Sequence, residues 1–424
     1  MLETLRNAWK VIDLRKKILF TLFIIVVFRI GSVVPVPFID VATLSSASGA
    51  AHDFFNVIST LGGGALTYGT IFALGVSPYI NSSIIMQLLG VAIPALVRLS
   101  QEGEEGKKKI AKYTRIVTVL LALLQGVGYF FYLLNGKFLT VKGGATVFAG
   151  FVIVLCLTAG STLVMWLGEQ IDAKGIGNGV SMLLFTGIIA QADEAFTSLY
   201  AYWMYGQYVT AIALVIAFLL VIAFIVWMTD AERRIPVQYA KKVVGRKMYG
   251  GQSTHIPIKV NMSGVMPIIF SSSILMVPTM ILSFMQGKEK LFIYKFLEMF
   301  STQGVFYALV YFAMIIAFAY FYVTIQYNPV EMANNLRQNS GAIPGIRPGT
   351  PTSDFIKKIL SRVTLLGALF LSVIAVVPIF VSIATKVNIS LGGTSIIILV
   401  GVALETVKNL ETQMLMRHYK GFLE

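Results

Sequence analysis

Few side chains in this 424-residue chain could perform acid–base, nucleophilic or metal chemistry. The single cysteine, Cys156, lies in an apolar stretch, so no disulfide framework or zinc-binding set can form within the chain. The three histidines fall in predicted loops or in the C-terminal tail, where a solvated surface histidine is the simplest interpretation. No nucleotide-binding glycine loop, paired carboxylates or nucleophile–base set is apparent. The sequence therefore predicts a protein that is not an enzyme and has no catalytic residue, metal site or cofactor.

The backbone of one apolar stretch, from Leu61 to Leu89, is more informative. It begins with three glycines and is interrupted by Gly75, Pro78 and a polar Asn-Ser-Ser step at 81–83. Because glycine weakens a helix interior and proline lacks a backbone donor, we expect a short half-helix up to about Gly75 and a longer helix restarting near Pro78. Irregular backbone at membrane depth persists only inside protein or beside a water-filled cavity. The stretch therefore indicates a channel or a transporter site.

Composition places these residues in a polytopic membrane protein. Hydrophobic residues make up 56% of the chain and charged residues only 13%, which excludes a soluble globule. A helix needs about 20 apolar residues to cross roughly 30 Å of hydrocarbon. The start of the chain has the cationic flank of a signal peptide, but no A-x-A-like site follows it, so we expect a retained first span. The ten predicted spans are 18–34, 72–96, 116–134, 147–167, 176–192, 209–228, 264–285, 304–326, 363–384 and 392–407.

Lysine and arginine are concentrated in alternate loops. Most of the 34 fall on one side of the predicted spans, together with both termini, and the positive-inside rule predicts that this side is cytoplasmic. The short loop at 97–115 has three acids followed by three lysines and is expected to be a solvated, charge-compensated turn. Six of the 34 lie in the opposite loops, and Arg29 lies within a predicted span.

Two of the basic loops, 229–263 and 327–362, are longer than a turn between spans requires. The first alternates polar and apolar residues around 237–244, which predicts a protruding hairpin, and the second places Arg347 in a turn rich in proline and glycine. Topogenic charge would explain the cations but not the length. Extended basic protrusions are typical of surfaces that dock an acidic or RNA-rich cytoplasmic partner.

Eight motifs that occur in order along the chain resemble those of the SecY family, the channel subunits of the bacterial protein-conducting translocon. The resemblance covers essentially the whole length. The motifs are FRIGS at 28–32, GGALT at 63–67 before IFALGVSPYINSSIIMQLL, LGEQIDAKGIGNGVS at 167–181, ERRIPVQYAKK at 232–242, GGQSTHIPIKVNMSGVMPIIF at 250–270, NPVEMANNLR at 328–337, PGIRPG at 344–349 and LGGTSIII at 391–398.

The resemblance implies an all-α fold of ten transmembrane helices in two pseudo-symmetric five-helix halves around a central pore. Here the halves would be 1–195 and 209–424, joined by an external hinge at 196–208, with a half-helix plug at about 61–73. It also implies a channel in the bacterial cytoplasmic membrane that passes unfolded secretory polypeptides and releases transmembrane segments laterally into lipid. The implied partners are the SecE and SecG membrane subunits, the SecA ATPase motor, the ribosome, and secretory preproteins with their signal peptides.

The same resemblance implies a pore constriction made of aliphatic side chains. Two pairs of them are spaced i,i+4, which places each pair on one helix face, and all lie near residues that interrupt the spans. A ring without hydrogen-bond partners for water or ions makes a dewetted constriction, although ordinary helix packing would explain the same residues. The implied ring residues are Val76, Ile80, Val180, Leu184, Ile269 and Ile398.

The plug would rest against the external side of this ring. A glycine-rich segment has little packing energy to lose, so we expect it to be displaced and to return, and a fixed re-entrant loop is the alternative. The implied plug residues are Leu61, Gly62, Gly63, Gly64, Thr67 and Gly69.

Polar residues inside spans are costly and therefore informative. Gln87, Gln125 and Asn261 match positions of the family's lateral gate, the seam between the halves, and interhelical hydrogen bonds of about 0.6 kcal/mol each are the simpler account. The cations implied to contact the motor or the ribosome are Arg233, Arg234, Lys241, Lys242, Arg246, Lys247 and Arg347.

Two other classes of protein share some of these features. An ion-coupled secondary transporter would also have broken helices and inverted halves, but it would normally need ionisable residues near the midplane. A membrane-anchored docking protein would explain the basic loops but not the interrupted spans.

Overall fold

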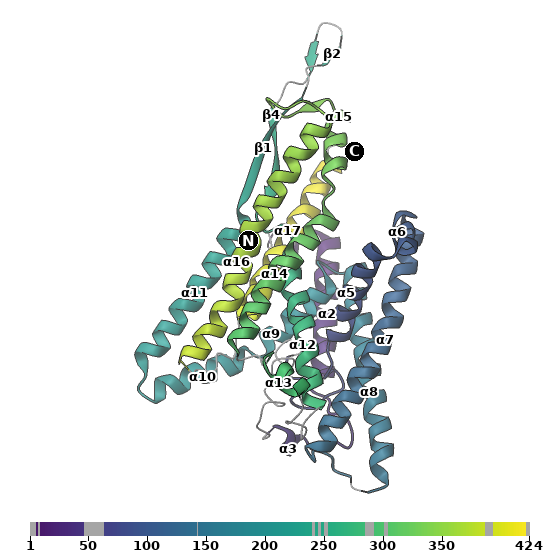
Figure 1. The fold of residues 1–424 in the computed structure, drawn as a ribbon, viewed down its shortest axis with the longest axis vertical. Helices are drawn as coiled ribbons and strands as arrows, with labels where there is room; N and C mark the ends of the chain where they lie inside the picture. Colours follow the sequence, from purple (N-terminus) through teal and green to yellow (C-terminus); the bar gives the residue numbers. More distant parts are fainter. Residues whose placement is uncertain are drawn as a thin grey trace.

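The computed structural model describes Arg6 and residues 9–45, 63–141, 143–239, 242–244, 247–249, 253–284, 292–300, 304–385 and 393–420. Most of these residues are helical (Figure 1). The helices before the predicted hinge are α2 (Ile12–Gly31), α3 (Val41–Ser45), α5 (Ser77–Ala92), α6 (Pro94–Gln101), α7 (Glu104–Asn135), α8 (Ala145–Lys174) and α9 (Gly179–Ala190). Helix α10 (Ala192–Met204) covers most of the hinge range, and the later helices are α11 (Tyr208–Asp230), α12 (Met266–Phe284), α13 (Phe292–Glu298), α14 (Val305–Gln326), α15 (Pro329–Gln338), α16 (Thr350–Thr385) and α17 (Gly393–Lys420).

Each of the ten predicted spans overlaps one of these helices. By length and composition, five helical stretches of the described chain can cross a membrane: α7, α8, α11, α14 with its continuation to Gln338, and α16. A sixth candidate is the pair α5 and α6, bent by 99° at Ile93, whose extended backbone is followed by Pro94. The residue before a proline is disfavoured in the α region, which explains the break at this position.

Two predicted irregular regions are helical. The solvated turn predicted at 97–115 is shorter than expected, because α6 ends at Gln101 and α7 already begins at Glu104. The exposed turn between them is charge-compensated as predicted, since Glu102 pairs with Lys109 (3.6 Å). Gly103 between the two helices has a positive φ (76°), which glycine adopts without steric cost. Glu104 and Glu105 in the first turn of α7 stabilise the helix, because their negative charges interact favourably with the positive end of its dipole. The long loop at 327–362 likewise contains α15 and the first three turns of α16.

The half-helix predicted up to about Gly75 is also wrong over the part that the structure describes. Residues 63–76 form a succession of turns, and a regular helix begins only at Ser77 with Pro78 in its first turn, where the sequence predicts the restart. Gly63, Gly69 and Gly75 have φ values of 70°, 57° and 53°. These left-handed residues are incompatible with a continuous right-handed helix.

The predicted hairpin is confirmed. Strands β1 (Glu232–Tyr239) and β4 (Ser253–Lys259) pair antiparallel, and β2 (Lys242–Val244) pairs with β3 (Lys247–Tyr249) between them. Strand β5 (Gly341–Ala342) adds to the free edge of β1. Ile235 and Val237 point from β1 into a cluster with side chains of α15 and α16, so the base of the hairpin has its own apolar core. These strands stand at one end of the molecule, beside α15 (Figure 1).

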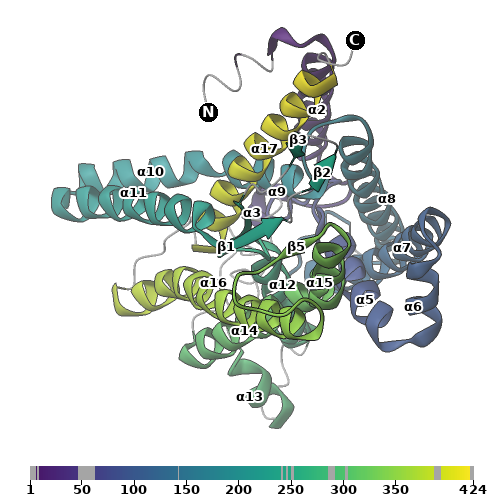
Figure 2. The ribbon, with the colours of Figure 1, turned by 90° about the horizontal axis from the view of Figure 1, so that it is seen from above.

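Seen from above, α5 to α8 gather on one side of the molecule and α12, α14 and α16 on another (Figure 2). Helices α2, α5, α7, α8 and α9 pack among themselves, as do α11, α12, α14, α16 and α17. Among the described residues, the two groups meet mainly in two places, where α9 contacts α17 and where α5 and α7 contact α12. One large apolar cluster contains side chains from both groups.

Candidate functional site

The six predicted ring residues all belong to this large cluster or pack against it. Val76, Ile80, Leu184, Ile269 and Ile398 are between 2% and 7% exposed, and Val180 packs against the cluster with intermediate exposure. They come from the start of α5, from α9, from α12 and from α17. The structure therefore brings together side chains that lie more than 300 positions apart in the sequence, from both helix groups.

Helix α9 is held in position by caps at its N-terminus. The Asn178 side chain accepts a hydrogen bond from the backbone N–H of Ser181 (3.1 Å), and Asp172 Oδ1 accepts one from that of Gly179 (2.7 Å). Gly179 is required at this point, because a Cβ there would lie 2.0 Å from the carbonyl oxygen of Gly168 on α8. These contacts fix the start of α9 and with it the first turn, which carries Val180.

Residues 63–76, which we call the strap, contain four of the six predicted plug positions. Leu61 and Gly62 lie outside the described residues. The strap contradicts the expectation of loose packing, since several of its side chains are at most 3% exposed: Ala65, Leu66, Thr70, Phe72, Ala73 and Val76. The glycines serve its tight turns rather than loosening it.

Backbone and side-chain hydrogen bonds tie the strap to its surroundings. The N–H of Val36 donates to the carbonyl of Gly69 (2.9 Å) and that of Ile71 to the carbonyl of Val34 (3.0 Å). The hydroxyl of Tyr129, on α7, donates to the carbonyl of Leu66 (2.8 Å). Tyr129 is not among the predicted site residues, although a tyrosine between Gly128 and an apolar run in a predicted span is a signal for a buried polar contact.

The predicted gate residues are distributed over three elements. Gln87 is exposed on α5, and its only described hydrogen bond is a long one to Ser83 on the same helix (3.4 Å). Gln125 is half-buried on α7. Asn261 precedes α12 by several residues and lies next to Gly367 of α16. Its Oδ1 atom is buried without a hydrogen-bond partner among the described residues.

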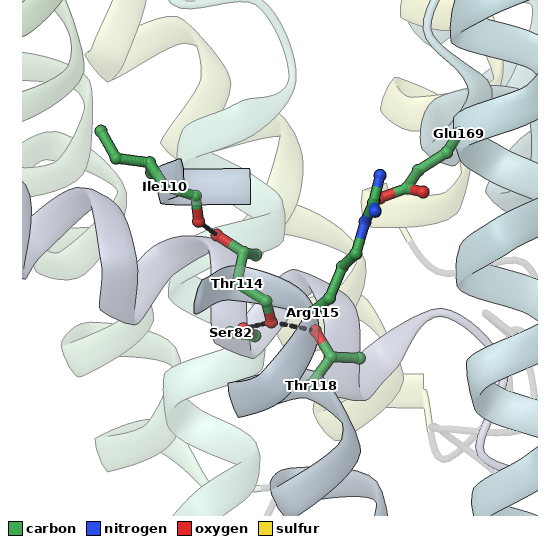
Figure 3. Close-up of polar contacts among 6 residues, drawn as sticks. All are labelled: Ser82, Ile110, Thr114, Arg115, Thr118 and Glu169. Atoms are coloured by element: carbon green, nitrogen blue, oxygen red, sulfur yellow. Dashed lines mark hydrogen bonds and ion pairs between the residues drawn. The ribbon is translucent and has the colours of Figure 1, made fainter. Parts of the chain in front are cut away.

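A hydroxyl cluster that the sequence analysis missed joins α5 to α7 close to the predicted gate (Figure 3). The carbonyl of Thr114 accepts hydrogen bonds from Ser82 Oγ (2.6 Å) and Thr118 Oγ1 (2.7 Å). Ser82 belongs to the Asn-Ser-Ser step at 81–83, whose polar character inside an apolar stretch is the signal for this contact. The next residue of α7 after Thr114, Arg115, forms an ion pair from its Nε to Glu169 Oε1 of α8 (2.7 Å, Figure 3). The three helices are thereby joined by polar contacts.

The predicted partner-binding cations lie mostly on the hairpin. Arg233 and Arg234 are exposed on β1, and Arg234 pairs with Glu232 on the same strand (2.6 Å). Lys242 and Lys247 lie in the paired strands β2 and β3, whereas Lys241 and Arg246 lie outside the described residues.

Arg347 is exposed in the turn before α16, between Gly345 and Gly349, both in the left-handed region. Its carbonyl accepts a hydrogen bond from Thr352 Oγ1 (2.8 Å), which ties the turn to the first residues of α16. Among the described residues, no group of histidine, cysteine or acidic side chains is arranged to hold a metal ion.

Comparisons with known proteins agree with these features. A sequence model of the SecY family matches residues 70–407. The chain is 42% identical to the protein translocase subunit SecY of Streptomyces coelicolor and 41% identical to that of Bacillus subtilis, in both cases over 100% of each chain. The corresponding protein of Mycobacterium tuberculosis is also 41% identical over the full length of both.

Solved structures share the fold. A protein-conducting channel has a TM-score of 0.67 at 17% identity, with 94% of this chain and 92% of that chain covered. Sec61 in a canine ribosome–channel complex has a TM-score of 0.61 at 15% identity, with 94% and 92% covered. Identities this low support the architecture alone, while the full-length matches at 41–42% identity establish kinship. The chain belongs to the SecY family.

Proposed function

We propose that this chain is a protein-conducting channel subunit, not an enzyme, that passes unfolded secretory polypeptides across a bacterial cytoplasmic membrane and releases transmembrane segments sideways into lipid. Family membership supports the proposal, because full-length relatives are named as protein translocase subunits. The structural observation that carries it is the large apolar cluster, to which helices of both groups contribute buried aliphatic side chains.

In this proposal the ring consists of Val76, Ile80, Val180, Leu184, Ile269 and Ile398. Aliphatic side chains give water and ions no hydrogen-bond partner, so a narrow ring of them stays dry at rest and can spread around a passing chain. Residues 61–73 close the external side of the ring in the resting channel. Gln87, Gln125 and Asn261 belong to the seam through which apolar segments reach lipid.

The proposed architecture has ten spans in two five-helix halves, 1–195 and 209–424, with both termini in the cytoplasm. The contact pattern supports this division, since the two helix groups touch mainly through α9 with α17 and through α5 and α7 with α12. The hairpin at 229–263 and the segment at 327–362 would then be cytoplasmic, and residues 196–208 would form the external hinge.

The proposed partners are SecE, SecG, the SecA motor, the ribosome, and preproteins with their signal peptides. Solved relatives in complex with ribosomes support the ribosome as a partner, including a canine Sec61 complex and a yeast Ssh1 complex. Arg233, Arg234 and Arg347 are exposed and suit an acidic or RNA-rich partner. The sequence adds four further cations to the proposed docking surface: Lys241, Lys242, Arg246 and Lys247.

Reconstitution tests the proposal directly. The chain, with its membrane partners, is placed in vesicles and supplied with motor, ATP and a preprotein. We expect the preprotein to become protease-protected only when channel, motor and ATP are all present. Protection at the level of channel-free vesicles, together with ion-driven solute uptake, would replace the proposal by a secondary transporter.

A single substitution tests the docking surface. We expect Arg347→Glu to reduce motor-driven protection at least tenfold, because the two prolines of its turn present the guanidinium with little entropy to lose on binding. Lys137→Glu, which makes the same charge change in the exposed α7–α8 connection, is the matched control and should remain active. Equal activity of the two variants would leave Arg347 as a topogenic charge.

A further inference from the structure

Side chains near both ends of the strap pack against neighbouring parts of the protein. Near its start, Leu66 packs in a buried cluster with Val36, Tyr129 and Leu133. Near its end, Phe72 stacks on Phe28 of α2, with ring centroids 5.9 Å apart and an interplanar angle of 14°. Moving the strap away would expose these side chains, which is opposed by the hydrophobic effect when they would meet water.

The backbone of the strap is paired as well. The bonds from Val36 and Ile71 described above flank Pro35 and Thr70, which face each other in an antiparallel bridge. Thr70 also donates from its N–H (3.0 Å) and its Oγ1 (3.1 Å) to the carbonyl of Ala65, closing the turn between them. Backbone groups at membrane depth must find partners within the protein, so releasing the strap would leave several of them unsatisfied.

Three polar side chains from neighbouring helices donate hydrogen bonds to carbonyls of the strap. Tyr129 of α7 is 2% exposed, and its hydroxyl donates to Leu66. Arg29, near the end of α2, donates from Nη1 to the carbonyl of Gly63 over 3.4 Å. A cation inside a span is costly and needs carbonyl or carboxylate partners, so this contact orients the beginning of the strap. Ser161 of α8 adds a third contact, to the carbonyl of Gly75 (3.4 Å).

We infer that the strap stays docked against α2, α7 and α8 while the channel conducts, and that Tyr129 is the positioning residue that keeps it there. The inference rests on the proposed function and refines it. From Gly63 onward, the range assigned above to the plug stays packed against these helices instead of leaving the ring with each substrate.

A disulfide across the bridge tests this inference. In the bridge, Pro35 and Thr70 form a pair that does not exchange hydrogen bonds with each other, the arrangement in which antiparallel side chains approach most closely. Such a separation suits a disulfide. The pair Pro35→Cys and Thr70→Cys is introduced after Cys156→Ser, which removes the only native thiol.

We expect the oxidised channel to protect preprotein at a rate within twofold of the same channel after reduction. A block on oxidation that reductant reverses would overturn the inference while leaving the proposed function intact. Failure of the Cys156→Ser parent to protect any preprotein would instead count against the proposed function. In that case, thiol labelling alone tests whether the strap stays docked.

Accessibility is measured with a membrane-impermeant maleimide on Leu66→Cys in the same background. We expect the cysteine at position 66 to be protected from labelling both with and without a preprotein in the channel. When Tyr129→Phe is added, we expect the cysteine to be labelled at least fivefold faster. Tyr113→Phe, which removes a hydroxyl from an exposed position of the same helix, should leave labelling unchanged. Labelling that appears with substrate although Tyr129 is present, or no effect of Tyr129→Phe, would overturn the inference.

Discussion

The two places where the helix groups meet differ in chemistry. Between α9 and α17, Thr406 Oγ1 donates to Met182 Sδ (3.5 Å), and nearby Lys17 of α2 donates to Gln413 of α17 (3.2 Å). Where α5 and α7 meet α12, by contrast, the buried aliphatic side chains of α5 and α12, such as Ile80 and Ile269, belong to one large apolar cluster. We call these the polar seam and the apolar seam.

The difference indicates which seam can open. Separating the polar seam would break hydrogen bonds in a setting with little water to replace them, which is unfavourable. Separating the apolar seam towards lipid exchanges contacts with side chains for contacts with acyl chains that are equally apolar. The hydroxyl cluster and the Arg115–Glu169 pair, meanwhile, join α5, α7 and α8, so we expect that side of the apolar seam to move as one body.

We expect the largest effect from a substitution in the small apolar cluster beside the polar seam. Leu410 of α17 is 3% exposed and packs with Leu14 of α2 and with Ile176, which precedes α9. Leu410→Ala removes buried methyl groups and leaves a cavity, so we expect a loss of about 3 kcal/mol in the free energy of unfolding. Unfolding in mixed micelles by increasing fractions of denaturing detergent measures it.

Thr412→Ala, two residues further along the exposed side of the same helix, is the control and should change little. A loss in the free energy of unfolding below about 1 kcal/mol for Leu410→Ala would mean that the polar seam is not more stable than the apolar seam.

A smaller effect is expected when polar groups are added to the apolar seam. Ile80 of α5 and Ile269 of α12 are 7% and 4% exposed and belong to the same cluster. Converting both to serine gives water hydrogen-bond partners at the proposed ring, so we expect resting ion conductance to rise about tenfold, a change of about 1.4 kcal/mol. Planar-bilayer recording measures this. The matched pair with valine at both positions keeps the site apolar and should stay closed, and an equal resting current in both double variants would remove the ring assignment.

The seams also show what the sequence could and could not predict. Apolar spacing located the helices, and Pro78 correctly marked the restart of α5, because a fixed φ and a missing donor act locally. Alternation around Val237 correctly predicted the hairpin, since its two faces differ in burial. The polar seam joins residues hundreds of positions apart, such as Lys17 and Gln413, and no local pattern in one sequence reports such a pairing.

The strap was the clearest failure of prediction. Its glycines suggested a loose half-helix, whereas the structure uses Gly63, Gly69 and Gly75 to make left-handed turns that press Leu66 and Phe72 into apolar clusters. Glycine content measures backbone freedom in the unfolded chain, but how tightly a glycine-rich segment packs depends on the neighbours that it meets.

The smallest effect is expected from the hydrogen bond that links α2 to α17. Lys17→Met keeps most of the apolar stem but removes the donor to Gln413, and because the contact is only partly buried we expect a loss of about 0.5 kcal/mol. Lys16→Met makes the same change at the neighbouring exposed position and is the matched control.

If α2 and α17 separate as the apolar seam opens, Lys17→Met should also favour opening and Lys16→Met should not. If they stay together, as the polar seam requires, both variants should release test segments of graded hydrophobicity at the same threshold, while only Lys17→Met unfolds at a lower detergent fraction. A shifted threshold for Lys17→Met alone would show that the polar seam takes part in opening, and the contrast between the two seams would then be one of degree.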